Sequence, residues 1–107
     1  MGVETGALDF YESIADASEQ MLSAARRADW DALIEAEKEC ARRVAALRAA
    51  GITGSLGREA DRRRHDILRT VLAHDAEIRA LTQPWMVKLE VLLNSAAAAR
   101  RVEQAYR

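Results

Sequence analysis

The chain has 107 residues, a mass of 11.9 kDa and a net charge of −1, so we expect a single domain. Half of its residues are hydrophobic, but 22 of them are alanine, which leaves a thin core between closely packed helices. One proline, five glycines and abundant alanine, arginine, glutamate and leucine argue against a β-sandwich or barrel. The composition therefore predicts an all-α fold.

Charge is distributed unevenly along the chain. Residues 1–39 carry a net charge of −7, and residues 40–107 carry +6. We expect an acidic first helix beside basic later helices, and the alternative is that the basic part meets an acidic partner. The near-zero total argues against nucleic-acid binding, as do the acidic neighbours of the basic run at 62–64 and the absence of an aromatic platform beside it.

Cysteine usage and the apolar runs indicate the cellular compartment. The single cysteine, Cys40, excludes an intrachain disulfide and suits a reducing compartment. The N-terminus lacks the pattern of a secretory signal, and no apolar run approaches the roughly 18 residues that span a bilayer. We therefore expect a soluble, cytoplasmic protein without a membrane span.

The first two predicted helices form an antiparallel hairpin. Apolar side chains recur at steps of three and four over residues 5–28 and again over 29–50, which is the spacing of an amphipathic helix. Asp29 stands where an N-cap of the second helix is expected, and Gly51 stands where that helix should end. Because the connection between the two helices is so short, they must pack side by side.

The third predicted helix is the longest. It covers about residues 57–95, after a glycine-rich loop at 51–57, and Pro84 lies inside its apolar stripe. Because the stripe keeps its phase across the proline, we expect a kinked but continuous helix. Residues 96–107 begin with four alanines and predict a short, loosely attached helical segment. The predicted architecture is an antiparallel bundle of three long helices plus this segment.

Few side chains suggest chemistry. Asp61 with His65, and His74 with Glu77, each share a helix face, but two isolated pairs are more typical of solvated or capping groups than of a metal site. Cys40 lies on an apolar stripe, where an inert thiol is expected. No phosphate-binding loop or nucleophile motif is present, so we expect neither a cofactor nor a metal.

Three polar residues, Glu37, Arg64 and His74, fall on otherwise apolar stripes. Small helical chorismate mutases bury arginines and a glutamate around a dianionic substrate, so an enzyme of that type is the alternative function. We prefer the interpretation that Glu37 and Arg64 extend to solvent or pair with each other, because most arginines here occur as doublets that point outward. The expected protein is not an enzyme.

The long helix carries more apolar side chains than a thin bundle can enclose. The main stripe contains Ile67, Val71 and Ile78, and a second row, formed by Leu68, Leu72, Met86 and Leu93, runs beside it. It could pack on a neighbouring helix or on the C-terminal segment. The functional interpretation is a groove that binds an amphipathic helix of another chain. A self-associating structural bundle, such as a homodimer, is a further alternative.

Three segments together resemble the flagellar export chaperone FliT family. They are Ala-Asp-Trp-Asp-Ala-Leu-Ile-Glu at 28–35, Ile-Leu-Arg-Thr-Val-Leu-Ala-His-Asp-Ala-Glu-Ile-Arg-Ala-Leu-Thr-Gln-Pro-Trp-Met at 67–86, and Arg-Arg-Val-Glu-Gln-Ala-Tyr at 100–106. The resemblance extends over nearly the whole chain, from about Leu8 to Tyr106.

The resemblance implies a cytoplasmic chaperone that binds the C-terminal helical segment of the filament-cap protein FliD. Such proteins prevent premature assembly and deliver their cargo to the export ATPase complex, and some also bind the regulator FlhDC and lower flagellar gene expression. In the family the C-terminal helix is thought to occlude the binding surface when cargo is absent. The predicted partner-binding residues, taken from the resemblance and from the second apolar row, are Leu68, Val71, Leu72, Asp75, Ile78, Met86, Leu93, Val102 and Tyr106.

Overall fold

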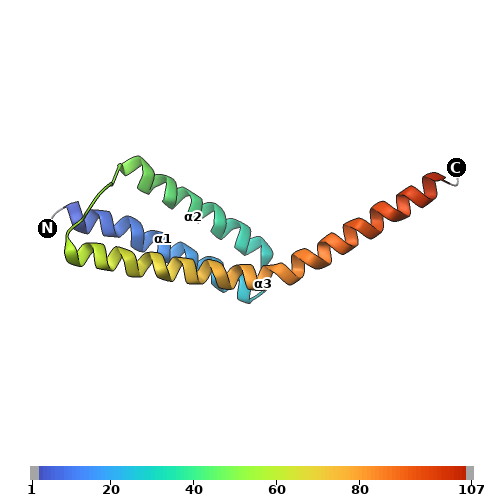
Figure 1. The fold of residues 1–107 in the computed structure, drawn as a ribbon, viewed down its shortest axis with the longest axis horizontal. Coiled ribbons are helices and arrows are strands. Elements are labelled where there is room, and N and C mark those ends of the chain that lie inside the picture. The colour runs from blue at the N-terminus through green and yellow to red at the C-terminus, as the bar shows by residue number, and fades with distance from the viewer. Residues whose placement is uncertain (1–2, 106–107) are drawn as a thin grey trace.

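The computed structural model describes residues 3–105, which form three α-helices and no β-strand (Figure 1). The helices are α1 (Val3–Arg26), α2 (Trp30–Ala50) and α3 (Arg58–Ala105). The all-α prediction is confirmed. The molecule measures 73 × 25 × 20 Å, so it is far longer than it is wide.

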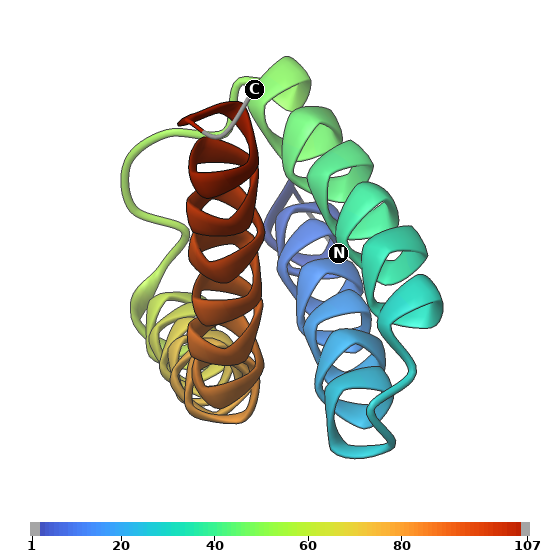
Figure 2. The ribbon, with the colours of Figure 1, turned by 90° about the vertical axis from the view of Figure 1, so that its right-hand side faces the viewer.

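Helix α1 lies between the other two helices and packs on both of them. Successive helices run in opposite directions, so α2 is antiparallel to its neighbour α1 (Figure 1). Helices α2 and α3 diverge, and no Cα atom of α2 comes within 8 Å of one in α3 (Figure 2). Their contact is made by side chains at one end, where the rings of Trp30 and Trp85 have centroids 5.5 Å apart. The bundle is therefore open between α2 and α3.

Local signals place the hairpin where the sequence predicts it. Ala28 adopts the left-handed φ of +54° that ends α1, and the Asp29 carboxylate accepts a hydrogen bond of 3.1 Å from the Ala32 amide. At the other end of α2, Gly51 has a φ of +65° and its amide donates to the Arg48 carbonyl at 3.1 Å. Both predicted helix caps are confirmed, since a side-chain acceptor and a left-handed residue satisfy backbone groups that the helix leaves free.

Asp61 ties the glycine-rich loop to the start of α3. Its carboxylate accepts hydrogen bonds from the Ser55 hydroxyl at 2.6 Å and from the Leu56 amide at 2.8 Å. Arg64 pairs with the same carboxylate at 3.0 Å, and the Leu56 side chain is buried beneath the loop. The hydrogen bonds from Ser55 and Leu56 lower the pKa of Asp61, because they stabilise its charged form. The sequence-based interpretation of Asp61 as a capping group agrees with this geometry.

Acid should therefore weaken the fold partly through Asp61. Because its pKa is lower in the folded chain than in the unfolded chain, its stabilising contribution is complete above the unfolded pKa of about 3.9 and is lost as the pH falls through the folded pKa. We expect Asp61→Asn to lower the thermal midpoint by a few degrees at pH 7 and by less below pH 4. Asp66→Asn, at an exposed position nearby, is the matched control. Equal losses in both variants at pH 7 would contradict the anchoring role.

The core is thin and lies mainly between α1 and α3. Its buried hydrophobic side chains include several alanines and only a few large residues. They are Ala7, Ile14, Ala17, Leu22, Ala24, Ala25, Leu56, Ile67 and Ile78. Helix α2 has no buried residue, although its apolar stripe faces α1. Helix α2 packs on α1 alone, so only one side of its apolar stripe is covered. Each residue of α2 therefore keeps part of its surface exposed to solvent.

Helix α3 is continuous through Pro84 and outlasts the rest of the bundle. Its 48 residues span about 72 Å, whereas the 24 residues of α1 span about 36 Å. The helix bends where its colour turns orange, a little after residue 80, as expected for a proline inside a helix (Figure 1). Beyond the bend it projects away from α1 and α2. The expected boundary at residue 96 is not a helix end, because the alanines of 96–99 favour continued helix.

Candidate partner-binding surface

The second apolar row of α3 forms an exposed stripe, which we call the outer row, made of Leu68, Leu72, Met86 and Leu93. Residues separated by these steps lie on one face of an α-helix. Leu72 is 68% exposed and Leu93 is 61% exposed. Between the two apolar halves of the row, Asp75 and Arg79 share the same face and form an ion pair of 2.8 Å. The surface is thus apolar at both ends and charged in its middle.

The outer row is uncovered because the neighbouring helices lie elsewhere. Helix α1 packs on the main stripe of α3, where Ile67 and Ile78 are buried. Helix α2 stays clear of α3 except at Trp30 and Trp85, and the projecting half of α3 does not fold back (Figure 1). The row is therefore exposed to solvent, and it packs neither on a neighbouring helix nor on the described part of the C-terminal segment.

The predicted binding residues nearest the body differ in exposure. Leu68 and Leu72 are exposed, and Val71 and Asp75 are half-buried. Ile78 is only 8% exposed, because it belongs to the stripe that faces α1 and packs with Leu22 and Ala25 there. Its side chain therefore belongs to the core in this structure.

The other predicted binding residues lie on the projecting half of α3. Met86, Leu93 and Val102 are each more than half exposed there. Tyr106 falls outside the described residues. The structure thus brings Leu68 and Leu72 together on the body and places the remaining exposed residues farther along the same helix.

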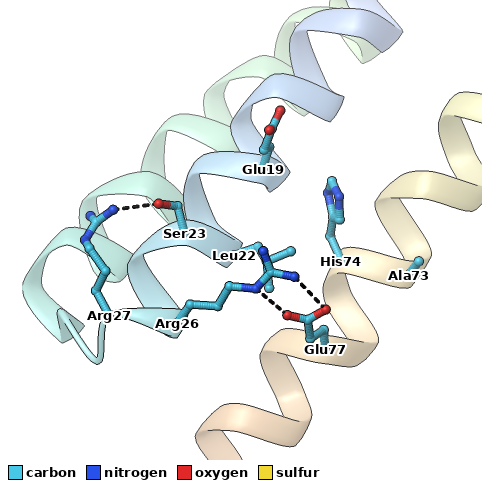
Figure 3. Close-up of a pocket in the computed structure, with 8 residues that line it drawn as sticks. All are labelled: Glu19, Leu22, Ser23, Arg26, Arg27, Ala73, His74 and Glu77. Carbon is cyan, nitrogen blue, oxygen red and sulfur yellow. Dashed lines mark hydrogen bonds and ion pairs between the residues drawn. The ribbon is translucent and has the colours of Figure 1, made fainter.

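A cleft between α1 and α3 has an open volume of about 430 Å³, and charged residues line it (Figure 3). The Arg26 guanidinium donates two hydrogen bonds to the Glu77 carboxylate, at 2.6 and 3.0 Å. Each group stabilises the charged form of the other, so the pKa of Glu77 is lowered and that of Arg26 is raised. This pair links the end of α1 to α3, and spacing in the sequence could not reveal it because the two residues lie 51 positions apart.

His74 has a structural partner in α1. Its Nδ1 lies 2.8 Å from the hydroxyl of Ser18, and that hydroxyl is also 2.8 Å from the Ala15 carbonyl, to which it donates. Ser18 is buried. Because the hydroxyl proton goes to Ala15, the imidazole Nδ1–H is the donor to Ser18. The polar group on the apolar stripe is thereby satisfied.

The charged residues on which a mutase-like enzyme would depend do not converge. Glu37 is exposed on α2, while Arg64 pairs with Asp61 and lies over the Tyr11 ring, 5.8 Å from its centroid. Of the two expected outcomes for Glu37 and Arg64, the mutual pair does not form, since α2 and α3 remain apart, and Glu37 extends to solvent instead. Cys40 is half-buried, and this burial raises the pKa of its thiol, which keeps it protonated.

Residues 3–105 hold no group of three or more side chains placed to bind a metal ion. No helix in this range is both long and apolar enough to cross a membrane. Glu12 of α1 pairs with Arg63 of α3 at 2.6 Å, so the predicted meeting of the acidic first helix with the basic later chain occurs there.

The projecting end of α3 should contribute little to stability. Every residue from 91 to 105 is exposed. We therefore expect deletion of residues 97–107 to change the free energy of unfolding by less than about 0.5 kcal/mol, measured by urea denaturation. The same deletion should alter affinity for a binding partner, because it removes Val102. Loss of cooperative unfolding would show instead that this segment supports the fold.

The chain is thus an all-α protein with an uncovered apolar row on its longest helix. The sequence profile of the family described as flagellar protein FliT matches residues 8–107, and the chain belongs to this family. The family is one of flagellar export chaperones rather than of enzymes.

A relative is the flagellar protein FliT of Photorhabdus laumondii subsp. laumondii. It is 26% identical to this chain over 99 residues, which cover 92% of this chain and 79% of the relative. No solved structure matches the chain.

Proposed function

We propose that this protein is a cytoplasmic, non-enzymatic chaperone of flagellar type III export that binds the C-terminal helical segment of the filament-cap protein FliD. The observation that carries the proposal is the exposure of the outer row on α3. Membership of the FliT family supports the class of function, and the apolar row supports recognition of a helix as the mode of binding.

Binding would begin at Leu68 and Leu72, which are one helical turn apart. An amphipathic cargo helix would lay its apolar side chains over them, and the Asp75–Arg79 pair would orient its polar flank. Burial of a leucine side chain contributes about 1.5–3 kcal/mol. Four such anchors along the outer row offset the cost of association and support micromolar or tighter binding.

Cargo covered in this way could not assemble early, because the segment needed for contacts in the filament cap would be occupied. The complex would then be delivered to the export ATPase complex. In the C-terminal part of the chain, Val102 and Tyr106 would contribute to partner binding. We further propose that the cargo-free chain binds the regulator FlhDC and so lowers flagellar gene expression.

Calorimetric titration of the full chain with a synthetic peptide of the FliD C-terminal segment tests the proposal. We expect one peptide per chain and a dissociation constant in the micromolar range or below. A peptide of the same composition in scrambled order is the control, since it keeps the charge but loses the apolar face. Failure of the native peptide to bind, or equal binding of both peptides, would contradict the proposal.

A further inference from the structure

The arginines in the first turns of α3 do not share one environment. Successive residues of a helix point about 100° apart, so the run of three arginines is spread over different faces. Arg63 pairs with Glu12 of α1 at 2.6 Å, and Arg64 pairs with Asp61 at 3.0 Å. Arg62 is left without an ion pair among the described residues.

Two further arginines lie on the same face of α3 as Arg62. Arg58 comes one helical turn earlier and Arg69 two turns later, and we call the three residues the basic stripe. All three side chains are exposed, and none has an ion pair or hydrogen bond with another residue in the described part of the chain. His65 takes the position between Arg62 and Arg69 on this face, so no carboxylate interrupts the stripe.

The fold itself does not need the basic stripe. The arginines that hold α1 to α3 are Arg26 and Arg63, and both are paired with carboxylates. Arg58 is the first residue of α3, where the helix macrodipole disfavours a positive charge. Like charges one turn apart also repel each other. Because the stripe opposes folding rather than supporting it, we look for its role in binding.

The basic stripe lies beside the leucines of the outer row. Its centre is about 50° around α3 from Leu72 and about 90° from Leu68, as the helical spacing requires. Arg69 follows Leu68 directly in the chain, and Arg58 lies about 15 Å farther toward the start of the helix. The surface that exposes two apolar anchors therefore continues into a row of free guanidinium groups.

We propose that the basic stripe binds carboxylates of the helix that the outer row takes, so that this chain selects an amphipathic helix with acidic residues next to its apolar anchors. The inference rests on the proposed function, because both use the same site. Guanidinium groups bind carboxylates through paired hydrogen bonds, and a helix can present one carboxylate per turn, which matches the spacing of the stripe. These charges would orient the bound helix and speed its association.

A narrow anionic partner fits the stripe better than a flat one. Glu59 and Asp66 are exposed on the side of the stripe away from the outer row. A lipid bilayer would meet these carboxylates together with the arginines, whereas a helix about 10 Å wide can lie along the stripe and the leucines without covering them. On the side of the outer row, the Asp61 carboxylate is already held by Ser55 and Leu56. The arrangement therefore favours a helix.

Two synthetic helical peptides with the same leucine face test the proposal. One carries glutamates along one flank of that face, and the other carries glutamines at the same positions. Fluorescence anisotropy of the labelled peptides, titrated with the full chain, measures both dissociation constants. We expect the glutamate peptide to bind about tenfold more tightly at low salt, because three exposed ion pairs act together. Equal binding of the two peptides, or binding of neither, would overturn the proposal.

Salt provides a second measurement on the same pair of peptides. We expect the preference for the glutamate peptide to fall to within about twofold at about 0.5 M salt, because mobile ions screen exposed charges. The glutamine peptide should bind almost equally at both salt concentrations, since its contacts are apolar. A preference that survives high salt unchanged would contradict recognition by the exposed arginines.

Replacement of all three stripe arginines by glutamine should remove the preference and leave binding of the glutamine peptide within about twofold of wild type, because the outer row is intact. A control variant loses the same charge at exposed positions away from the stripe, and its changes are Arg27→Gln, Arg100→Gln and Arg101→Gln. Circular dichroism verifies that both variants are folded. The proposal would be overturned if the stripe variant kept the preference or if the control lost it equally. Binding to phosphatidylserine vesicles through the stripe, with no preference between the peptides, would also overturn it.

The outcome is separate from the test of the proposed function, because neither synthetic peptide contains FliD sequence. If the FliD peptide binds but the synthetic peptides show no preference, the basic stripe is rejected and the proposed function is retained. If the glutamate peptide is preferred but the FliD peptide does not bind, the stripe is retained and FliD is rejected as the cargo.

Discussion

Replacement of both Leu68 and Leu72 by aspartate should abolish binding of the FliD peptide while the protein stays folded. Both side chains are exposed on α3, so the change removes little from the core. In a complex, however, two apolar anchors would be lost and two carboxylates would be placed against the apolar face of the cargo. Loss of about 1.5–3 kcal/mol per leucine lowers the affinity at least 100-fold. Calorimetry measures the affinity, and circular dichroism verifies that the helices remain.

A matched variant separates loss of the apolar row from a general effect of negative charge. Thr70→Asp with Ala73→Asp adds the same two carboxylates to exposed positions of the same helix segment, but on another face. We expect its affinity for the peptide to stay within about threefold of wild type. Undiminished binding in the leucine variant would show that cargo does not use this part of the outer row.

The second large effect is expected in the core. Ile78→Ala should lower the free energy of unfolding by about 2–4 kcal/mol, because the lost methyl groups leave a cavity against Leu22 and Ala25. Met21 and Leu33 pack at the edge of this cluster and can close the cavity only in part. Few other large side chains are buried, so the loss is a large share of the 5–15 kcal/mol typical of a small domain. Urea denaturation followed by circular dichroism measures it.

Leu72→Ala is the control for this core variant, because it shortens a side chain on the same helix that is 68% exposed. We expect it to change the free energy of unfolding by less than about 0.5 kcal/mol. Similar losses in both variants would mean that Ile78 is not the core contact described above, and that its side chain is free for a partner after all.

The features that the sequence predicted well depend on neighbouring residues. Asp29 caps α2 because its carboxylate reaches an amide three positions later, and Gly51 ends that helix because glycine tolerates a positive φ. The continuity of α3 through Pro84 likewise follows from the unbroken apolar phase of its stripe. The two caps need only a few consecutive residues, and the continuity of α3 needs only the spacing along one helix.

The features that the sequence could not predict depend on the angle between helices. Periodicity placed Ile78 next to the outer row, and only the packing of α1 on α3 buried it. Likewise, the Glu37–Arg64 pair would require α2 to approach α3, and it does not. The Arg26–Glu77 pair joins residues 51 positions apart, and no spacing rule identifies such a contact.

By itself the sequence determined that this chain is helical, where its hairpin turns and that its apolar residues form two rows on the longest helix. Helix propensity, caps and periodicity are local, so they are already present in the order of the residues. Which of the two rows is covered depends on how the helices pack against one another. Because α1 is half as long as α3 and α2 diverges from α3, the first row is covered as far as Ile78, while Leu81, Trp85 and the outer row stay exposed.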